Sequence, residues 1–143
     1  MNRPAAFLLL LWIAAPASAL ATGLSSLDEL KALANESTLL LAQEQFEGGF
    51  QVLKPHWPVP AAELQLVIRQ TSADWPRIRA QFGKSQGIRY LGEQRLSSTF
   101  IRYSYLHRFE NGSGQWQFTF QQFQDSWLVD GVAFVEGPPL TAE

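Results

Sequence analysis

The chain has 143 residues, a formal net charge of −2 and no cysteine, which suits one domain with a single hydrophobic core and excludes disulfides and a lipid-modified cysteine. Two histidines, without cysteine and without an acidic cluster at ligand spacing, predict neither a metal site nor a cofactor. The net acidic character argues against nucleic acid as a partner.

The first nineteen residues have the pattern of a secretory signal peptide, with a basic start at Arg3, an apolar core and small residues at its end. We expect cleavage after Ala19, with Ala21 as a second candidate, and a mature protein in the periplasm or outside the cell. The alternative is a transmembrane anchor. A span needs about 20 apolar residues, and this core is shorter and ends at Pro16.

Residues 20–143 are predicted to form one domain whose first half is helical. Ser26 and Glu29 have the spacing of a capping box, and leucines follow at helical intervals. This pattern predicts a helix over residues 26–45. The glycine pair at 48–49 is expected to end it.

Three prolines in residues 54–60 exclude regular structure there. A second helix is predicted over residues 61–72, where apolar residues return at helical spacing. Pro76 suits the first turn of a third helix, which ends at Gly83. His56 lies in the proline-rich segment, where it either caps the mouth of a binding site or is an ordinary surface residue.

Four antiparallel strands are predicted after the helices, over residues 88–96, 99–109, 115–121 and 127–135. The third reads Gln-Trp-Gln-Phe-Thr-Phe-Gln, the unbroken alternation of a half-buried strand. Glycines and turn-forming polar residues separate the strands. The fold class is therefore α+β, with N-terminal helices packed on a curved four-stranded antiparallel meander.

A set of core residues in this layout resembles that of a known superfamily. The residues are Phe82-Gly83, Tyr103-Ser104-Tyr105, the Trp-Gln-Phe-Thr-Phe segment that begins at Trp116, and Trp127-Leu128-Val129. Together with the order of elements, they resemble an exported bacterial branch of the nuclear transport factor 2-like superfamily, which has a cystatin-like fold. The resemblance implies a cone-shaped sheet covered by helices, often with a pocket and often dimeric. It implies no single function, because members include isomerases, dehydratases and domains without known activity.

The predicted inner face of the sheet carries an aromatic wall. The candidate ligand-binding residues are Tyr90, Tyr103, Tyr105, His107 and Trp116. Such a wall suits a flat or apolar small ligand. The alternative is that these rings fill the core, with their polar atoms satisfied locally.

His107 is the only ionisable residue predicted on the inner face. A lyase or isomerase reaction in such a cone would use it as an acid or base, with a tyrosine as the oxyanion donor, and would need an inward carboxylate. Glu93 is predicted to point outward, and so is Asp130 if Asp125 and Ser126 form a two-residue turn. A lone histidine is more often a hydrogen-bonded core residue. The sequence therefore predicts an exported, non-catalytic domain that binds a small apolar or aromatic ligand or a protein partner.

The charge is unevenly distributed, since residues 69–108 hold eight basic and two acidic side chains. One pairing of the first two strands places Arg89 opposite Arg108 and Arg95 opposite Arg102 on the outer face. Like charges directly opposed are destabilising. Either the register is shifted, or an anion or acidic partner relieves the repulsion, or the side chains extend into water.

An apolar patch is predicted on the outer face, on the assumption that Asp125 and Ser126 form a two-residue turn. The candidate interface residues of a homodimer are Phe123, Leu128, Val132 and Phe134. Two alternatives remain. The tail after Gly137 can cover the patch, or a bulge at residues 121–122 can turn Phe123 inward.

Overall fold

The computed structural model describes residues 21–137. The predicted signal peptide and the tail after Gly137 lie outside the described residues. The elements are α3 (Leu27–Ala42), α4 (Phe46–Gln51), the 3-10 turn η1 (Lys54–His56), α5 (Ala61–Phe82), β2 (Ser85–Arg95), β3 (Phe100–Phe109), β4 (Gly112–Phe123) and β5 (Ser126–Glu136). Helices followed by strands confirm the predicted α+β class.

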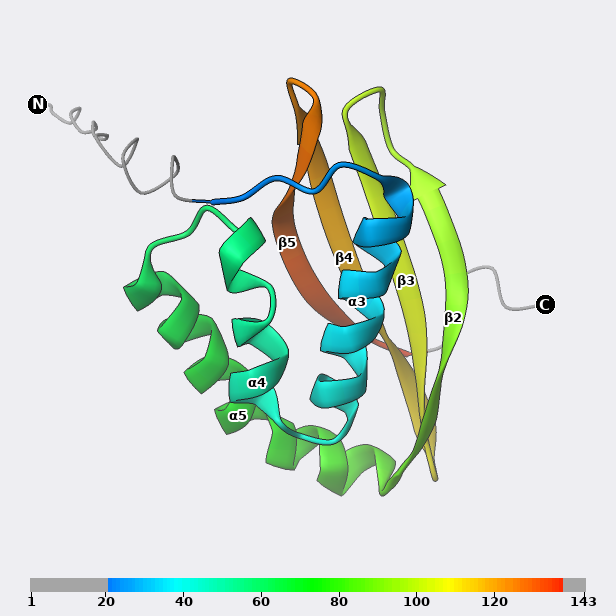
Figure 1. Ribbon diagram of the computed structural model, residues 1–143. Helices are drawn as coiled ribbons and strands as arrows, with labels where there is room; N and C mark the ends of the chain where they lie inside the picture. Colours follow the sequence, from blue (N-terminus) through cyan, green and yellow to red (C-terminus); the bar gives the residue numbers. More distant parts are fainter. Residues whose placement is uncertain (1–20, 138–143) are drawn as a thin grey trace, which may run out of the picture.

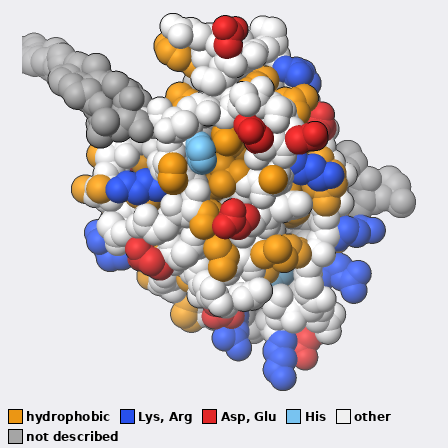
Figure 2. Space-filling view, in the orientation of Figure 1, with side chains coloured by type: hydrophobic (Ala, Val, Ile, Leu, Met, Phe, Trp, Pro, Cys, Tyr) orange, Lys and Arg blue, Asp and Glu red, His pale blue; other side chains and the backbone are white. Residues whose placement is uncertain are grey.

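The four strands form one antiparallel meander in the order β2-β3-β4-β5, with β2 and β5 as its edges. The sheet is strongly twisted and open, and the helices lie on one side of it (Figure 1). Hydrophobic side chains gather near the middle of this helix-bearing side, with charged side chains around them (Figure 2). No helix within residues 21–137 is long and apolar enough to cross a membrane.

Helix α3 begins where the capping pattern predicts. The Ser26 hydroxyl accepts a hydrogen bond from the backbone N–H of Glu29 at 3.2 Å, and the Glu29 carboxylate accepts one from the N–H of Ser25 at 2.7 Å. The return bond thus reaches one residue further back than in a standard capping box. The helix ends at Ala42, and Glu44, with a φ of 62°, turns the chain toward α4.

The sequence predicted that the glycine pair at 48–49 ends a helix. In the structure, the pair lies inside the short helix α4. A Cβ atom added to Gly49 would lie 2.6 Å from Cδ2 of Leu41 on α3. The Ser37 hydroxyl also donates a hydrogen bond to the carbonyl of Gly49 at 2.7 Å. Position 49 therefore needs glycine, because a side chain there would prevent the close approach of α3 and α4. The periodicity of the sequence does not reveal this requirement.

The second and third predicted helices are one continuous helix, α5, with Pro76 in its interior. Proline in a helix removes one backbone hydrogen bond and costs about 3 kcal/mol or more. The neighbouring side chains of Trp75 and Ile78 are both buried, and each contributes about 1.5–3 kcal/mol by burial. Packing against the sheet therefore offsets the local cost of the proline.

The observed pairing of β2 with β3 differs from the pairing that would place arginines directly opposite each other. Arg89 lies opposite Leu106 and Arg102 lies opposite Gln94. A bulge at Leu91 also exchanges the two faces of β2 beyond it. Because of this bulge, Glu93 lies opposite the inward-facing Tyr103, so the prediction that Glu93 points outward was wrong.

The β4–β5 hairpin departs from its prediction in the same way. Its turn consists of residues 124–125, one residue earlier than expected, and β5 has a bulge at Asp130. Beyond the bulge, Val132 pairs with Phe118 and Phe134 pairs with Trp116, both of which face the helices. The predicted outer patch was therefore wrong for Val132 and Phe134, which point inward.

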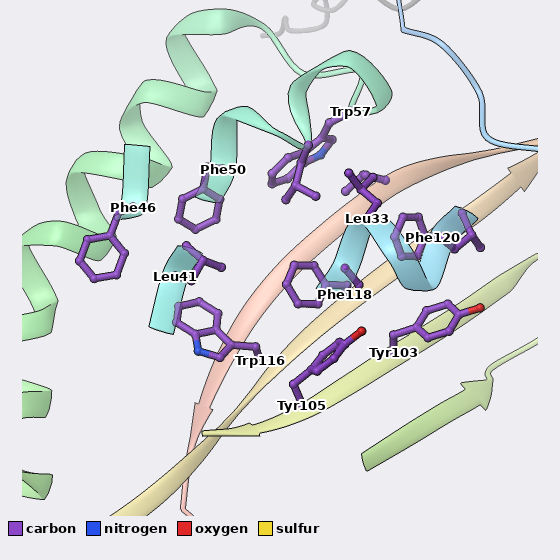
Figure 3. Close-up of a cluster of buried hydrophobic side chains, with 14 of the residues drawn as sticks. Leu33, Leu41, Phe46, Phe50, Trp57, Tyr103, Tyr105, Trp116, Phe118 and Phe120 are labelled. Carbon is purple, nitrogen blue, oxygen red and sulfur yellow. The ribbon is translucent and has the colours of Figure 1, made fainter. Parts of the chain in front are cut away.

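The core fills the space between the helices and the inner face of the sheet. Strand β4 contributes Trp116, Phe118 and Phe120, and these rings meet side chains from α3 and α4, including Leu41 and Phe50 (Figure 3). The Trp127 side chain also belongs to the core, as predicted. The aromatic residues of the sheet therefore form the packed interior of the domain.

Candidate functional site

All five predicted ligand-binding residues lie on the helix-facing side of the sheet, as expected. Tyr103, Tyr105, His107 and Trp116 are buried, and Tyr90 is half-buried. Lys31 of α3 places its ammonium group 4.2 Å above the ring of Tyr90, a cation–π contact. The helices thus occupy the space in which a ligand against this wall would lie.

The hydroxyl groups of the two buried tyrosines join strand β3 to helix α3. Tyr103 donates to the carbonyl of Leu27 at 3.3 Å, and Tyr105 donates to the carbonyl of Lys31 at 3.4 Å and to the side chain of Asn35. Burial raises the pKa of Tyr103 to about 12 and raises that of Tyr105 as well. Both tyrosines are therefore neutral donors used to attach the helix.

His107 is fully buried, and both of its ring nitrogens have partners. Trp116 donates its indole N–H to Nδ1 at 3.1 Å, and Nε2 lies 2.7 Å from the hydroxyl of Ser85. Because Nδ1 accepts, the neutral ring carries its proton on Nε2 and donates it to Ser85. Phe109 stacks on the ring with the centroids 4.2 Å apart. Burial lowers the pKa of His107 to about 4.

This arrangement has the features of a structural histidine. No carboxylate hydrogen-bonds to His107 within residues 21–137, and the ring lines neither of the two cavities described below. In the same part of the chain, no three histidine or acidic side chains gather as metal ligands would.

One cavity lies at the end of the sheet that carries the β4–β5 turn, and we call it the hairpin groove. Its volume is about 600 Å³. Its walls come from three separate segments: Ala21 and Gly23; Trp57, Pro58 and Val59; and Gln121, Phe123, Ser126, Leu128, Val129 and Asp130. In Figure 1, the N-terminal segment passes beside this end of the sheet.

Backbone contacts fasten the walls of the groove. The N–H of Thr22 donates to the carbonyl of Pro55 at 2.7 Å, and His56 donates from Nδ1 to the carbonyl of Thr22 at 2.6 Å. Leu24 and Trp127 exchange two backbone hydrogen bonds of 2.8 Å, like residues of paired strands. His56 therefore holds the N-terminal segment in place, and hydrogen bonds join the walls of the groove.

The groove combines an apolar floor with a small polar rim. Trp57, Val59 and Leu128 supply apolar surface, while Ser126 and Asp130 supply hydrogen-bonding groups at its edge. Phe123 projects beside it and is 61% exposed. An apolar lining with a few polar groups is typical of small-molecule sites.

A second cavity, the α5 cleft, lies between helix α5 and strand β5. It has a volume of about 190 Å³. Trp75, Trp116 and Phe134 give it an aromatic lining, and Trp75 and Phe134 lie with their ring centroids 5.1 Å apart. Arg77 of α5 bridges to Glu136 of β5 at 2.6 Å beside it. The cleft is too small for most ligands of drug size.

The four predicted interface residues fall into two separate places. Phe123 and Leu128 line the hairpin groove, whereas Val132 and Phe134 line the α5 cleft. The bulge at Asp130 separates the two pairs. Trp116 is the one predicted ligand-binding residue that borders either cavity, and it belongs to the α5 cleft.

Sequence reasoning missed the wall formed by Trp57, Pro58 and Val59. A signal for it was present, because a tryptophan between prolines is a rigid aromatic residue in a segment without regular structure. Helical and strand periodicity assign Trp57 to no site, because the segment has neither period.

Comparison of the chain with protein-family models, curated proteins and solved structures finds no match. The resemblance to the nuclear transport factor 2-like superfamily therefore stays a prediction from the residue pattern.

Proposed function

We propose that the protein is an exported, non-catalytic binding domain that holds a small apolar or aromatic ligand in the hairpin groove. The observation that carries the proposal is the contrast between two spaces. The aromatic interior of the sheet is filled by α3 and α4, whereas the groove offers about 600 Å³. Ligand sites usually measure about 300–1,000 Å³. The α5 cleft, at about 190 Å³, falls below this range.

The construction of the groove supports a binding role. Its walls are joined by the bonds of Thr22 to Pro55 and of Leu24 to Trp127, and Pro58 further restricts one wall. Walls that are held together by hydrogen bonds lose little conformational entropy when a ligand enters. Burial of an aromatic ring against Trp57 and Leu128 supplies apolar contact area, and the rim fixes orientation.

The neutral fluorescent probe N-phenyl-1-naphthylamine tests this proposal. The probe should bind with a rise in fluorescence, and Phe123→Ser and Leu128→Thr should each weaken binding by about tenfold, which corresponds to a loss of about 1.4 kcal/mol. Leu39→Ser is the matched control, since Leu39 is 52% exposed on α3, outside the groove. If all three variants bind the probe like wild type, the groove is not the site.

Export is part of the proposal and rests on the leader pattern of the first nineteen residues. The processed protein should begin at Leu20 or close to it. N-terminal sequencing of the protein recovered from the periplasm or the medium measures this directly. An intact Met1 on the recovered protein would overturn the assignment.

A protein partner, including a second copy of the chain, is the second candidate. Phe123 is 61% exposed, more than any other large hydrophobic residue of the described chain, and exposed aromatic side chains often anchor interfaces. Sedimentation velocity over a concentration series should then show a wild-type dimer that Phe123→Ser dissociates. A wild-type monomer at every concentration would overturn the homodimer and leave the ligand proposal standing.

A further inference from the structure

The face of the sheet opposite the helices has an unusual composition over strands β2, β3 and β4. Residues of β3 alternate, and Tyr103, Tyr105 and His107 point into the core, so Arg102 and Arg108 point to the opposite face. Arg89 lies opposite Leu106 in the register and shares that face. The glutamines of β4, such as Gln115 and Gln117, lie beside these arginines.

This surface, which we call the arginine–glutamine face, carries no carboxylate. Strands β2, β3 and β4 contain one acidic residue, Glu93, and the bulge at Leu91 places it opposite Tyr103 on the helix-facing side. The ion pairs within residues 21–137 are formed by Arg77 and Arg79 of α5. The arginines of the sheet thus have no carboxylate partner in the described part of the chain.

The spacing of the arginines suits an extended polyanion. Arg89 and Arg108 are diagonal neighbours across β2 and β3, a relation that places such residues about 7–8 Å apart. Arg102 is six residues from Arg108 along β3, which corresponds to about 20 Å. The positive charges therefore extend along a strand, with hydrogen-bonding glutamines beside them.

The face lacks the features that other polyanionic partners need. Leu106 at its middle is 6% exposed and is flanked across the strands by Arg89 and Gln115, whose long side chains can cover apolar surface. The exposed apolar side chains Leu91, Phe123 and Val135 lie on three different strands, so they form no continuous apolar centre for a protein partner. Phe100 and Phe123 lie beyond Arg102, at the end of the sheet that carries the β4–β5 turn, so bases placed along the arginines between Arg102 and Arg108 would find no aromatic ring to stack on.

We propose that the arginine–glutamine face binds an acidic polysaccharide of the uronic-acid class. Guanidinium groups form paired hydrogen bonds with carboxylates, and the sugar hydroxyls match the amide groups of the glutamines, which both donate and accept. The proposal is independent of the hairpin groove, because the two surfaces share none of the residues that carry the argument.

Affinity electrophoresis of the purified protein through gels that contain polygalacturonate tests the proposal. The polymer should retard wild type, the retardation should fall as salt rises, and neutral dextran should have no effect. The triple substitution Arg89→Gln, Arg102→Gln and Arg108→Gln should weaken binding by at least about tenfold. Arg69→Gln is the control, since Arg69 is an exposed arginine on α5.

Poly-L-glutamate tests whether the face prefers the carboxylates of a polysaccharide or those of an acidic protein. Retardation by polygalacturonate but not by poly-L-glutamate supports a polysaccharide partner. Retardation by poly-L-glutamate alone would overturn the proposal in favour of an acidic protein. Equal retardation of wild type and the triple variant, with both shown to be folded by their thermal melts, would exclude this face altogether.

Discussion

Trp116 and His107 are joined side chain to side chain in the interior, with the indole N–H donating to Nδ1 across 3.1 Å. They lie on neighbouring strands, β4 and β3, and Trp75 of α5 stacks on both rings at centroid distances of 5.7 and 5.9 Å. The bond fixes the tautomer of the histidine. The stacking of Trp75 joins the centre of the sheet to helix α5.

Trp116→Phe should separate the contribution of this bond from that of packing. The phenyl ring keeps most of the apolar contacts, but Nδ1 of His107 loses its donor, which should cost about 1–3 kcal/mol of unfolding free energy. Trp116→Ala removes the ring itself and should cost about 3–5 kcal/mol. Denaturant unfolding measures both. If the Phe variant is as stable as wild type, the bond contributes nothing to the fold.

The stability of the protein should depend on pH through His107. Its pKa is lowered by burial from 6.5 to about 4, so between these values the unfolded chain binds a proton that the folded chain does not. The contribution is fully present above pH 6.5 and is lost as the pH falls toward 4, by at most about 3 kcal/mol. Unfolding of wild type and His107→Gln at pH 7 and pH 4.5 should show a smaller pH effect in the variant. Equal effects would mean that His107 titrates normally.

The two glycines of α4 should respond oppositely to alanine. In Gly49→Ala the new methyl group would lie 2.6 Å from Cδ2 of the buried Leu41, and such overpacking costs about 1–3 kcal/mol. In Gly48→Ala the nearest atom, Cδ1 of Leu40, is 3.8 Å away, so the better helix propensity of alanine should leave stability equal or raise it by up to about 1 kcal/mol. Thermal melts of both variants test the close approach of α3 and α4. Equal loss in both would contradict it.

Arginine substitutions on β5 should reveal the bulge at Asp130. Val132 packs against the core, so Val132→Arg should lower the melting temperature strongly. Val135 is 44% exposed and pairs with Gln115 on the outer face, so Val135→Arg should change stability by less than about 0.5 kcal/mol. A strand without the bulge would give the opposite order, which makes the pair a direct test of the register.

The sequence by itself determined the fold class and the face of most strand residues. Alternation with a period of two located strands β3 and β4, because one side of a sheet must be apolar where helices cover it. The same pattern assigned Tyr103, Tyr105, His107 and Trp116 to the inner face, and the Ser26 cap located the start of the first helix.

Only the tertiary structure decided the features that depend on contacts between distant segments. Two bulges, at Leu91 and Asp130, exchanged the faces of strand residues beyond them, and a one-residue shift has no local signal when both faces contain apolar residues. Pro76 remains inside α5 because its neighbours bury their side chains against the sheet. The hairpin groove likewise depends on hydrogen bonds between Thr22, Pro55 and His56, and a local pattern of side chains does not encode which distant backbone groups will meet.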